Sequence, residues 1–401
     1  MPAAMRTITN HLKTPALLAS LLLIGATAGA APAAARSGKE SVRLNEIQVM
    51  GTHNSYKREL SRTEERTYDE IIATPGDYEK FLAYSHPGIP NQFARQDVRG
   101  LELDLFPDPQ GGLYAEPLVR KRLGTGPLPD PAWRQAGVKV LHIADLDYKT
   151  SCVRLVTCLE QVERWSDDNP GHVPLQILLE LKQSDARAVA QGGVVAPPWE
   201  LDQLDALDGE IRSVFSERDL ITPDDLRRPG LTLEQSVRRH GWPSLSRSRG
   251  QVIFLLDNEP GAIRQRYTAG RPNLEGRVIF TNSRPGFPDA AFVKRNEPRG
   301  ANTAQIQDLV RQGYLVRTRS DVPLATVTAN DPAMLQAALV SGAQMISTDF
   351  PQIGMTGRYD SDYVARLPED LPARCNPANA PRGCDSESLD RAGPYPSTRR
   401  R

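Results

Sequence analysis

The chain reads Val49-Met50-Gly51-Thr52-His53-Asn54-Ser55-Tyr56 at the point that decides its fold. The apolar residues up to Met50 are typical of a short buried strand, which we expect to break at Gly51 and Thr52. His53 and Asn54 would then lie at the carboxyl end of that strand, with a proton-transfer group beside an oxygen ligand. A histidine that merely caps a strand would look the same, so this interpretation depends on what later strands bring to the same end.

Further apolar runs of strand length recur along the chain. Parallel strands joined by crossover helices have such nearly uninterrupted apolar sequences, and eight of them in one domain favour an α/β fold, a distorted (β/α)8 TIM barrel. An open doubly wound sheet is the alternative, although no glycine-rich dinucleotide or phosphate loop follows any strand. The predicted strands are residues 46–50, 100–106, 138–143, 173–181, 251–257, 277–282, 314–319 and 343–348.

The first 35 residues have the pattern of a secretory signal peptide. Arg6 and Lys13 precede an apolar run over residues 16–28, and small residues follow up to Ala35. The run is shorter than the roughly 20 residues that a transmembrane helix needs. We therefore expect a secreted or periplasmic monomer, with a catalytic barrel over residues 36–365 and a Pro-rich polar tail over residues 366–401.

The four cysteines all lie in the part predicted to be exported. An even number of cysteines in an oxidising compartment favours disulfides. Proximity in the sequence pairs Cys152 with Cys158 and Cys375 with Cys384, while two other connectivities stay open. A zinc site is disfavoured because no histidine lies near either pair at ligand spacing.

Charge is balanced, with 49 basic and 49 acidic residues among 401. This balance argues against a nucleic-acid partner, whose binding depends on an excess of positive charge. It leaves room for a small anionic substrate held in a local pocket.

Glu102 and Asp104 are the most informative residues at the predicted strand ends. They are two residues apart on one strand and so share a face, which directs both carboxylates into the barrel mouth. Two adjacent buried carboxylates are costly unless a cation or a shared proton compensates. Asn54 and Glu180 add oxygen donors, and such hard donors favour Ca2+ or Mg2+. Structural salt bridges from Arg317 or Arg319 to the carboxylates are the alternative.

Other polar residues follow the remaining strands. Two histidines and a cation suit attack on phosphorus, because one group can remove a proton while another protonates the leaving oxygen. Lys182 and a strand-seven arginine, Arg317 or Arg319, could hold a phosphate or a ring hydroxyl. The further strand-end residues are His142, with Asp145 and Asp147 beyond it, Asp257 and Asp349.

These motifs together carry a resemblance. In order and over about residues 43–348, the chain resembles phosphoinositide-specific phospholipase C, in particular its secreted, calcium-dependent bacterial branch. That resemblance implies a distorted (β/α)8 barrel with calcium as cofactor. The motifs are Gly51-Thr52-His53-Asn54-Ser55-Tyr56, Leu101-Glu102-Leu103-Asp104, Leu141-His142 and Leu179-Glu180-Leu181-Lys182.

The resemblance also implies roles for individual residues. Asn54, Glu102, Asp104 and Glu180 match the family's calcium ligands, and His53 and His142 match its paired catalytic histidines. In that mechanism the inositol 2-hydroxyl attacks the phosphodiester, a cyclic inositol phosphate forms and diacylglycerol leaves. We assign His142 as the general acid. His53 would stabilise the charged phosphorane or act as the base, with Glu102 as the rival base.

The chain also departs from the family pattern. The spacing from Asp104 to His142 is longer than in the eukaryotic enzymes, and no pleckstrin, EF-hand or C2-like module is evident. Transient contact with a membrane would then fall to rim residues within 81–84 or 107–128. Metal-free relatives place a basic residue where calcium lies, and the Glu102/Asp104 pair argues against that version.

Two other functions remain open on this sequence. A glycerophosphodiester phosphodiesterase or a phospholipase D-like hydrolase shares the barrel, but usually has arginine after the first histidine, where this chain has Asn54. The third hypothesis is a non-catalytic protein that binds inositol phosphates or lipid headgroups. Intact His53 and His142 argue against it.

Overall fold

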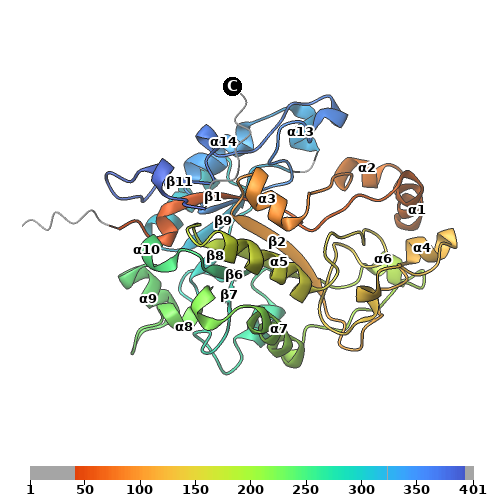
Figure 1. The fold of residues 1–401 in the computed structure, drawn as a ribbon, viewed down its shortest axis with the longest axis horizontal. Coiled ribbons are helices and arrows are strands. Elements are labelled where there is room, and N and C mark those ends of the chain that lie inside the picture. Colours follow the sequence, from red (N-terminus) through yellow and green to blue (C-terminus); the bar gives the residue numbers. More distant parts are fainter. Residues whose placement is uncertain (1–40, 323, 393–401) are drawn as a thin grey trace, which may run out of the picture. The chain divides into compact units, whose positions relative to one another are not determined.

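A computed structural model describes residues 41–322 and 324–392 of the chain, and Figure 1 shows its fold. The predicted signal peptide lies outside the described residues, as do the last nine residues of the tail. Within the described ranges, no helix combines the length and apolarity needed to cross a membrane.

Eight parallel strands form the centre of the fold, and Figure 1 shows helices placed around them. Neighbouring strands are hydrogen-bonded in the order β6-β4-β2-β1-β10-β9-β8, and β7 pairs with β6. A single parallel bridge between Asn282 and Phe292 joins the end of β7 to β8 and completes the ring. The predicted distorted (β/α)8 barrel is therefore confirmed. The strands are β1 (Ile47–Thr52), β2 (Gly100–Phe106), β4 (Leu175–Leu181), β6 (Val252–Leu256), β7 (Ile279–Thr281), β8 (Phe292–Lys294), β9 (Leu315–Arg319) and β10 (Met345–Thr348).

The connections between barrel strands are irregular. No helix separates β7 from β8, whereas five α-helices and one 3-10 helix lie between β4 and β6. A capping box formed by Thr232 and Gln235 begins α9. The helices are α1 (Arg62–Ile72), α2 (Asp77–Phe81), α3 (Ile89–Arg95), α4 (Leu118–Leu123), α5 (Leu155–Asp168), α6 (Ala186–Val189), α7 (Leu201–Val214), α8 (Pro223–Leu226), α9 (Leu233–His240), α10 (Leu245–Ser248), α11 (Ala262–Tyr267), α12 (Ala301–Arg311), α13 (Ala325–Ala329) and α14 (Ala333–Ser341).

Three short strands lie outside the ring. β3 (Lys139–Val140) runs antiparallel to the end of β2, β5 (Leu220–Ile221) pairs with β6, and β11 (Ala373–Cys375) runs antiparallel to β1. The pairing of β11 brings part of the predicted tail against the first barrel strand. Both disulfides predicted from proximity, Cys152–Cys158 and Cys375–Cys384, are present.

The number of barrel strands was predicted correctly, but one of the eight predicted strands is not part of the barrel. Residues 138–143 do not form a barrel strand, because only Lys139–Val140 is extended and it pairs antiparallel with β2. The missing member is β8, whose three residues are too few to stand out as an apolar run. β1 also continues through Gly51 and Thr52, where we expected it to break.

Two glycines allow β1 and β2 to lie close together. The two strands pair at Gly51 and Gly100. A Cβ atom on either residue would lie 2.6 Å from Cε of Met345 and within 3.2 Å of the other glycine's backbone. Movement of the flexible Met345 side chain can relieve the 2.6 Å contact, but the approach to backbone atoms is closer than most real Cβ contacts. A side chain at this junction would therefore force the two strands apart.

We expect Gly51→Ala to lower the free energy of unfolding by about 1–3 kcal/mol, as overpacked cores usually lose that much. Urea unfolding followed by circular dichroism measures the change. Gly209→Ala is the matched control, because nothing lies within 4 Å of its added Cβ on α7. That control should be neutral or slightly stabilising. Equal stability of Gly51→Ala and the wild-type protein would contradict the packing argument.

Candidate functional site

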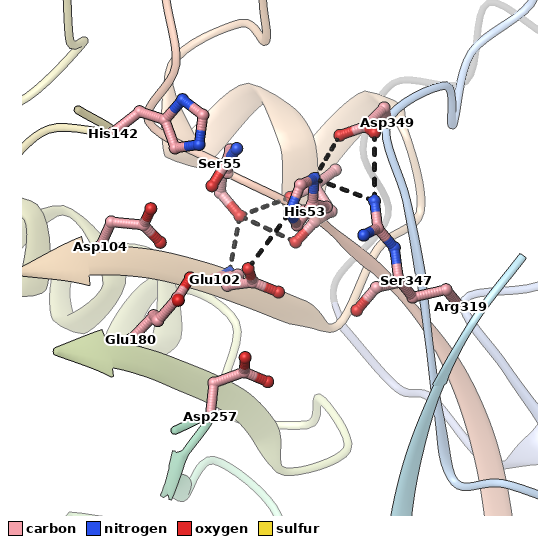
Figure 2. Close-up of polar contacts among 12 residues, drawn as sticks. His53, Ser55, Glu102, Asp104, His142, Glu180, Asp257, Arg319, Ser347 and Asp349 are labelled. Atoms are coloured by element: carbon pink, nitrogen blue, oxygen red, sulfur yellow. Dashed lines mark hydrogen bonds and ion pairs between the residues drawn. The ribbon is translucent and has the colours of Figure 1, made fainter. Parts of the chain in front are cut away.

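A group of four carboxylates lies at the carboxyl ends of adjacent barrel strands. Glu102 and Asp104 share one face of β2, and Asp104 is in register with Glu180 on β4. Ligand oxygens of Glu102, Glu180 and Asp257 lie within 4.8 Å of one another. Figure 2 shows these side chains directed toward a common space. The inward direction predicted for Glu102 and Asp104 is thus seen in the structure.

Basic side chains accompany these carboxylates. Nη2 of Arg317 lies 2.6 Å from Oε2 of Glu102. Nζ of Lys182 lies 3.2 Å from both Oδ2 of Asp104 and Oε2 of Glu180. Nζ of Lys294 lies 2.9 Å from Oδ2 of Asp257. The salt bridge between Arg317 and Glu102, which we considered as the alternative to a metal site, is present. The three bases do not balance the four carboxylates, however, and one negative charge is left over.

The excess of negative charge has electrostatic consequences. Burial raises the pKa of Glu102 to about 7, because the Arg317 guanidinium does not offset burial and the nearby Asp257 and Glu180 carboxylates. Burial also raises the pKa of Asp104 well above its ordinary value, despite the opposing effect of Lys182. Two buried carboxylates with raised pKa values on one strand are characteristic of functional sites.

The carboxylates fit a divalent cation. Oδ1 of Asp257 is buried and accepts no hydrogen bond from any described residue. Nη1 of Arg317 is 3.8 Å from this oxygen, too far for a hydrogen bond. A buried oxygen without a hydrogen bond is unfavourable, so its position suits a closer positive charge. Carboxylate oxygens that converge from three strands form the hard donor set that Ca2+ prefers.

His53 follows directly after β1 and lies beside the carboxylates. Its Nδ1 is 2.8 Å from Oδ1 of Asp349, and its Nε2 is 3.5 Å from Oε1 of Glu102. Burial, with the positive charges of Arg319 and Arg317, lowers the pKa of His53 well below its usual value. Because the Asp349 carboxylate accepts a hydrogen bond from Nδ1, Nε2 of the neutral ring is left as the proton acceptor.

His142 reaches the same region from the connection between β2 and β4. Its Nδ1 is 2.9 Å from Oδ2 of Asp147, and this oxygen is also 2.9 Å from Nζ of the buried Lys57. Burial lowers the pKa of His142 although Asp147 opposes the shift. Burial alone would raise the pKa of Asp147, but Lys57 and His142 outweigh it and hold that pKa below the ordinary value. Figure 2 shows His53 beside Glu102, and His142 on the side of the view where Asp104 lies.

Asn54 lies in a different environment from the carboxylates. Its Nδ2 donates to the Tyr84 hydroxyl at 3.0 Å, and its Oδ1 accepts from the Tyr56 hydroxyl at 3.4 Å. The residue is buried and has a left-handed φ of 47°. Its amide therefore contacts two tyrosines here, and its role as a calcium ligand stays a prediction.

The structure brings most of the predicted site residues together. Arg319 joins the same network through Asp349, since its Nη2 lies 3.6 Å from Oδ2 of that residue and 3.4 Å from Nδ1 of His53. The sequence signal for Asp257 and Asp349 was present, since both follow apolar runs, but we gave them no role. Lys294 was missed because β8 was missed, and no sequence pattern marked Lys57.

Comparison with known proteins identifies the family. The family described as phosphoinositide phospholipase C, Ca2+-dependent, matches residues 42–377. The chain belongs to this family. Calcium is accordingly the cofactor, and Glu102, Glu180 and Asp257 could hold it. No curated protein matches the chain.

Solved structures give more distant similarities. A calcium-dependent phosphoinositol-specific phospholipase C from a Gram-negative bacterium, Pseudomonas sp., is 16% identical, with 84% of this chain and 96% of that chain covered and a TM-score of 0.49. A calcium-dependent phosphatidylinositol-specific enzyme from Streptomyces antibioticus is also 16% identical, with 80% and 98% covered and a TM-score of 0.46. A glycerophosphoryl diester phosphodiesterase from Parabacteroides distasonis is 12% identical, with 81% and 90% covered and a TM-score of 0.26.

We expect Asp257→Asn to weaken calcium binding roughly tenfold or more, since the affinity of such sites depends on the number of charged ligands. Isothermal titration calorimetry of the purified protein measures the dissociation constant. Asp202→Asn removes an exposed carboxylate on α7 and is the matched control. An unchanged dissociation constant for a well-folded Asp257→Asn protein would exclude Asp257 from the site.

Proposed function

We propose that this phospholipase C cleaves phosphatidylinositol through attack of the inositol 2-hydroxyl on phosphorus, which yields a cyclic inositol phosphate and diacylglycerol. The main support is the arrangement of the two histidines. Each has Nδ1 bonded to a buried aspartate, so each keeps Nε2 for proton transfer beside the carboxylate group. One proton acceptor and one proton donor are what an internal phosphodiester displacement needs.

His142 is proposed as the general acid that protonates the diacylglycerol oxygen as its bond to phosphorus breaks. Asp147 fixes its ring and favours the protonated form, while Lys57 holds Asp147 from the other side. His53 is proposed to remove the proton from the 2-hydroxyl or to stabilise the charged phosphorane. Glu102, 3.5 Å from His53, is the rival base.

Calcium, when bound, would lower the pKa of the 2-hydroxyl and offset the charge of the phosphate. Glu102, Glu180 and Asp257 are proposed to hold it, with Asp104 and Asn54 as further candidates. Asp104 contributes its charge next to Glu180, while the Asn54 amide would have to give up its contacts with Tyr56 and Tyr84.

The three basic residues predicted to bind substrate differ in their surroundings. The side chain of Arg317 is 2% exposed and also donates to Ser347 and Asn296, so we propose that it mainly supports Glu102. The side chains of Arg319 and Lys182 are 18% and 20% exposed. These two are the better candidates for contact with the phosphate or an inositol hydroxyl.

We further propose that the rim of the barrel touches the membrane surface that presents the lipid. Large apolar residues are exposed in connections that follow barrel strands, among them Phe81 after β1, Leu113 after β2, Val195 after β4 and Ile353 after β10. The connections that contain them leave the barrel at the end where the carboxylates lie. Two disulfides fit an extracellular protein, in agreement with the predicted export.

We expect the protein to convert phosphatidylinositol in vesicles into a cyclic inositol phosphate, and a calcium chelator to abolish this turnover. Phosphorus NMR identifies the product. Glycerol 3-phosphate formed from a deacylated diester, without any cyclic product, would instead indicate a glycerophosphodiester phosphodiesterase. Calcium binding with no turnover of either substrate would favour the non-catalytic alternative.

His142→Ala should lower kcat by a factor of about 100 to 10,000, the usual contribution of a general acid. The kcat for phosphatidylinositol is compared with that of His240→Ala, which removes an exposed imidazole at the end of α9. The control should retain wild-type activity. If folded His142→Ala also retained it, His142 would have no part in the proton transfer.

A further inference from the structure

Lys182 has an unusual place among the basic residues of the site. Its ammonium lies between two carboxylates, 3.2 Å from Asp104 on β2 and 3.2 Å from Glu180 on β4. Its backbone is fixed, since its N–H donates to Leu105 and its carbonyl accepts from Trp199. A positive charge is thus positioned where oxygen atoms of adjacent strands would otherwise repel each other.

The other two bases are held more firmly. Arg317 is almost fully buried and has Ser347 and Asn296 as partners in addition to Glu102. Lys294 has a 9% exposed side chain that bridges Asp257 and Glu259. The Lys182 side chain is 20% exposed, and within residues 41–322 and 324–392 its ammonium pairs only with Asp104 and Glu180. Its flexible stem can therefore carry the charge toward water.

We infer that Lys182 is a built-in competitor of calcium and sets the affinity of the site. In the absence of the cation, its ammonium neutralises Asp104 and Glu180, and it must leave them before a divalent cation can use Glu180. This inference rests on the proposed function, because it presupposes a calcium site formed by these carboxylates. Once calcium has displaced it, the Lys182 ammonium is free to contact the substrate phosphate.

Calcium and the Lys182 ammonium would compete for the same carboxylate oxygens. Two positive charges cannot share the same carboxylate oxygens without repulsion. Solvent screens this repulsion only in part, because Asp104 is buried although 33% of the Glu180 side chain is exposed. Removal of the ammonium would leave Asp104 with no described cation within ion-pair distance, which destabilises the calcium-free protein. Both effects act in the same direction, since each makes calcium binding more favourable when Lys182 is replaced.

The test is a calcium titration by calorimetry of the wild-type protein, Lys182→Met, Lys182→Arg and Lys149→Met. We expect Lys182→Met to bind calcium roughly tenfold or more tightly than the wild type, and to gain more thermal stability from calcium. Lys182→Arg keeps the charge and should not tighten binding. Lys149 pairs with Glu64, away from the carboxylate group, so Lys149→Met should match the wild type.

Turnover supplies an independent readout. At saturating calcium, Lys182→Met should have a higher KM for phosphatidylinositol, because the freed ammonium is missing. Should Lys182→Met not fold without calcium, it can be purified with calcium and titrated with a chelator of known affinity. Unchanged or weaker calcium binding in folded Lys182→Met would overturn the inference and leave the proposed function intact. No calcium binding by the wild-type protein would overturn both.

Discussion

The burial of two carboxylates on one face of β2 is the constraint on which the site depends. Leu101, Leu103 and Leu105 pack into the main core, and strand alternation then directs Glu102 and Asp104 to the opposite face. Both are almost completely buried, so their charges need compensation from other strands. Lys182, directly after the neighbouring β4, and Arg317 from β9 provide part of it, and the curvature of the barrel brings β9 within reach of β2.

Both histidines are held by a contact between Nδ1 and an aspartate, but the two pairs come from different parts of the fold. His53 follows a barrel strand, and its aspartate comes from the end of β10, at the far end of the sequence. His142 follows a strand that runs antiparallel to β2, and its aspartate is five residues further on. Because both rings are fixed through Nδ1, both present Nε2, although only His53 is placed by the barrel itself.

Residues with strong local signals were predictable, and those defined by tertiary pairing were not. The alternation in residues 101–105 predicted the direction of Glu102 and Asp104, and the long apolar runs predicted most barrel strands. β8 was missed because its three residues owe their extended form to pairing with β9 rather than to their own pattern. Lys294 was lost with it. For Lys57, a lysine in a polar connection gives no sign that folding will bury it against Asp147.

The balance of charge at the site connects these observations. Glu102, Asp104, Glu180 and Asp257 carry four negative charges when ionised, and Arg317, Lys182 and Lys294 carry three positive ones, which leaves one negative charge. A cation added to all three bases would give one positive charge in a buried site. A cation that replaces Lys182 makes the group neutral, because two charges arrive and one departs. Neutrality favours the exchange over simple addition, and the displaced ammonium then lies beside an anionic substrate.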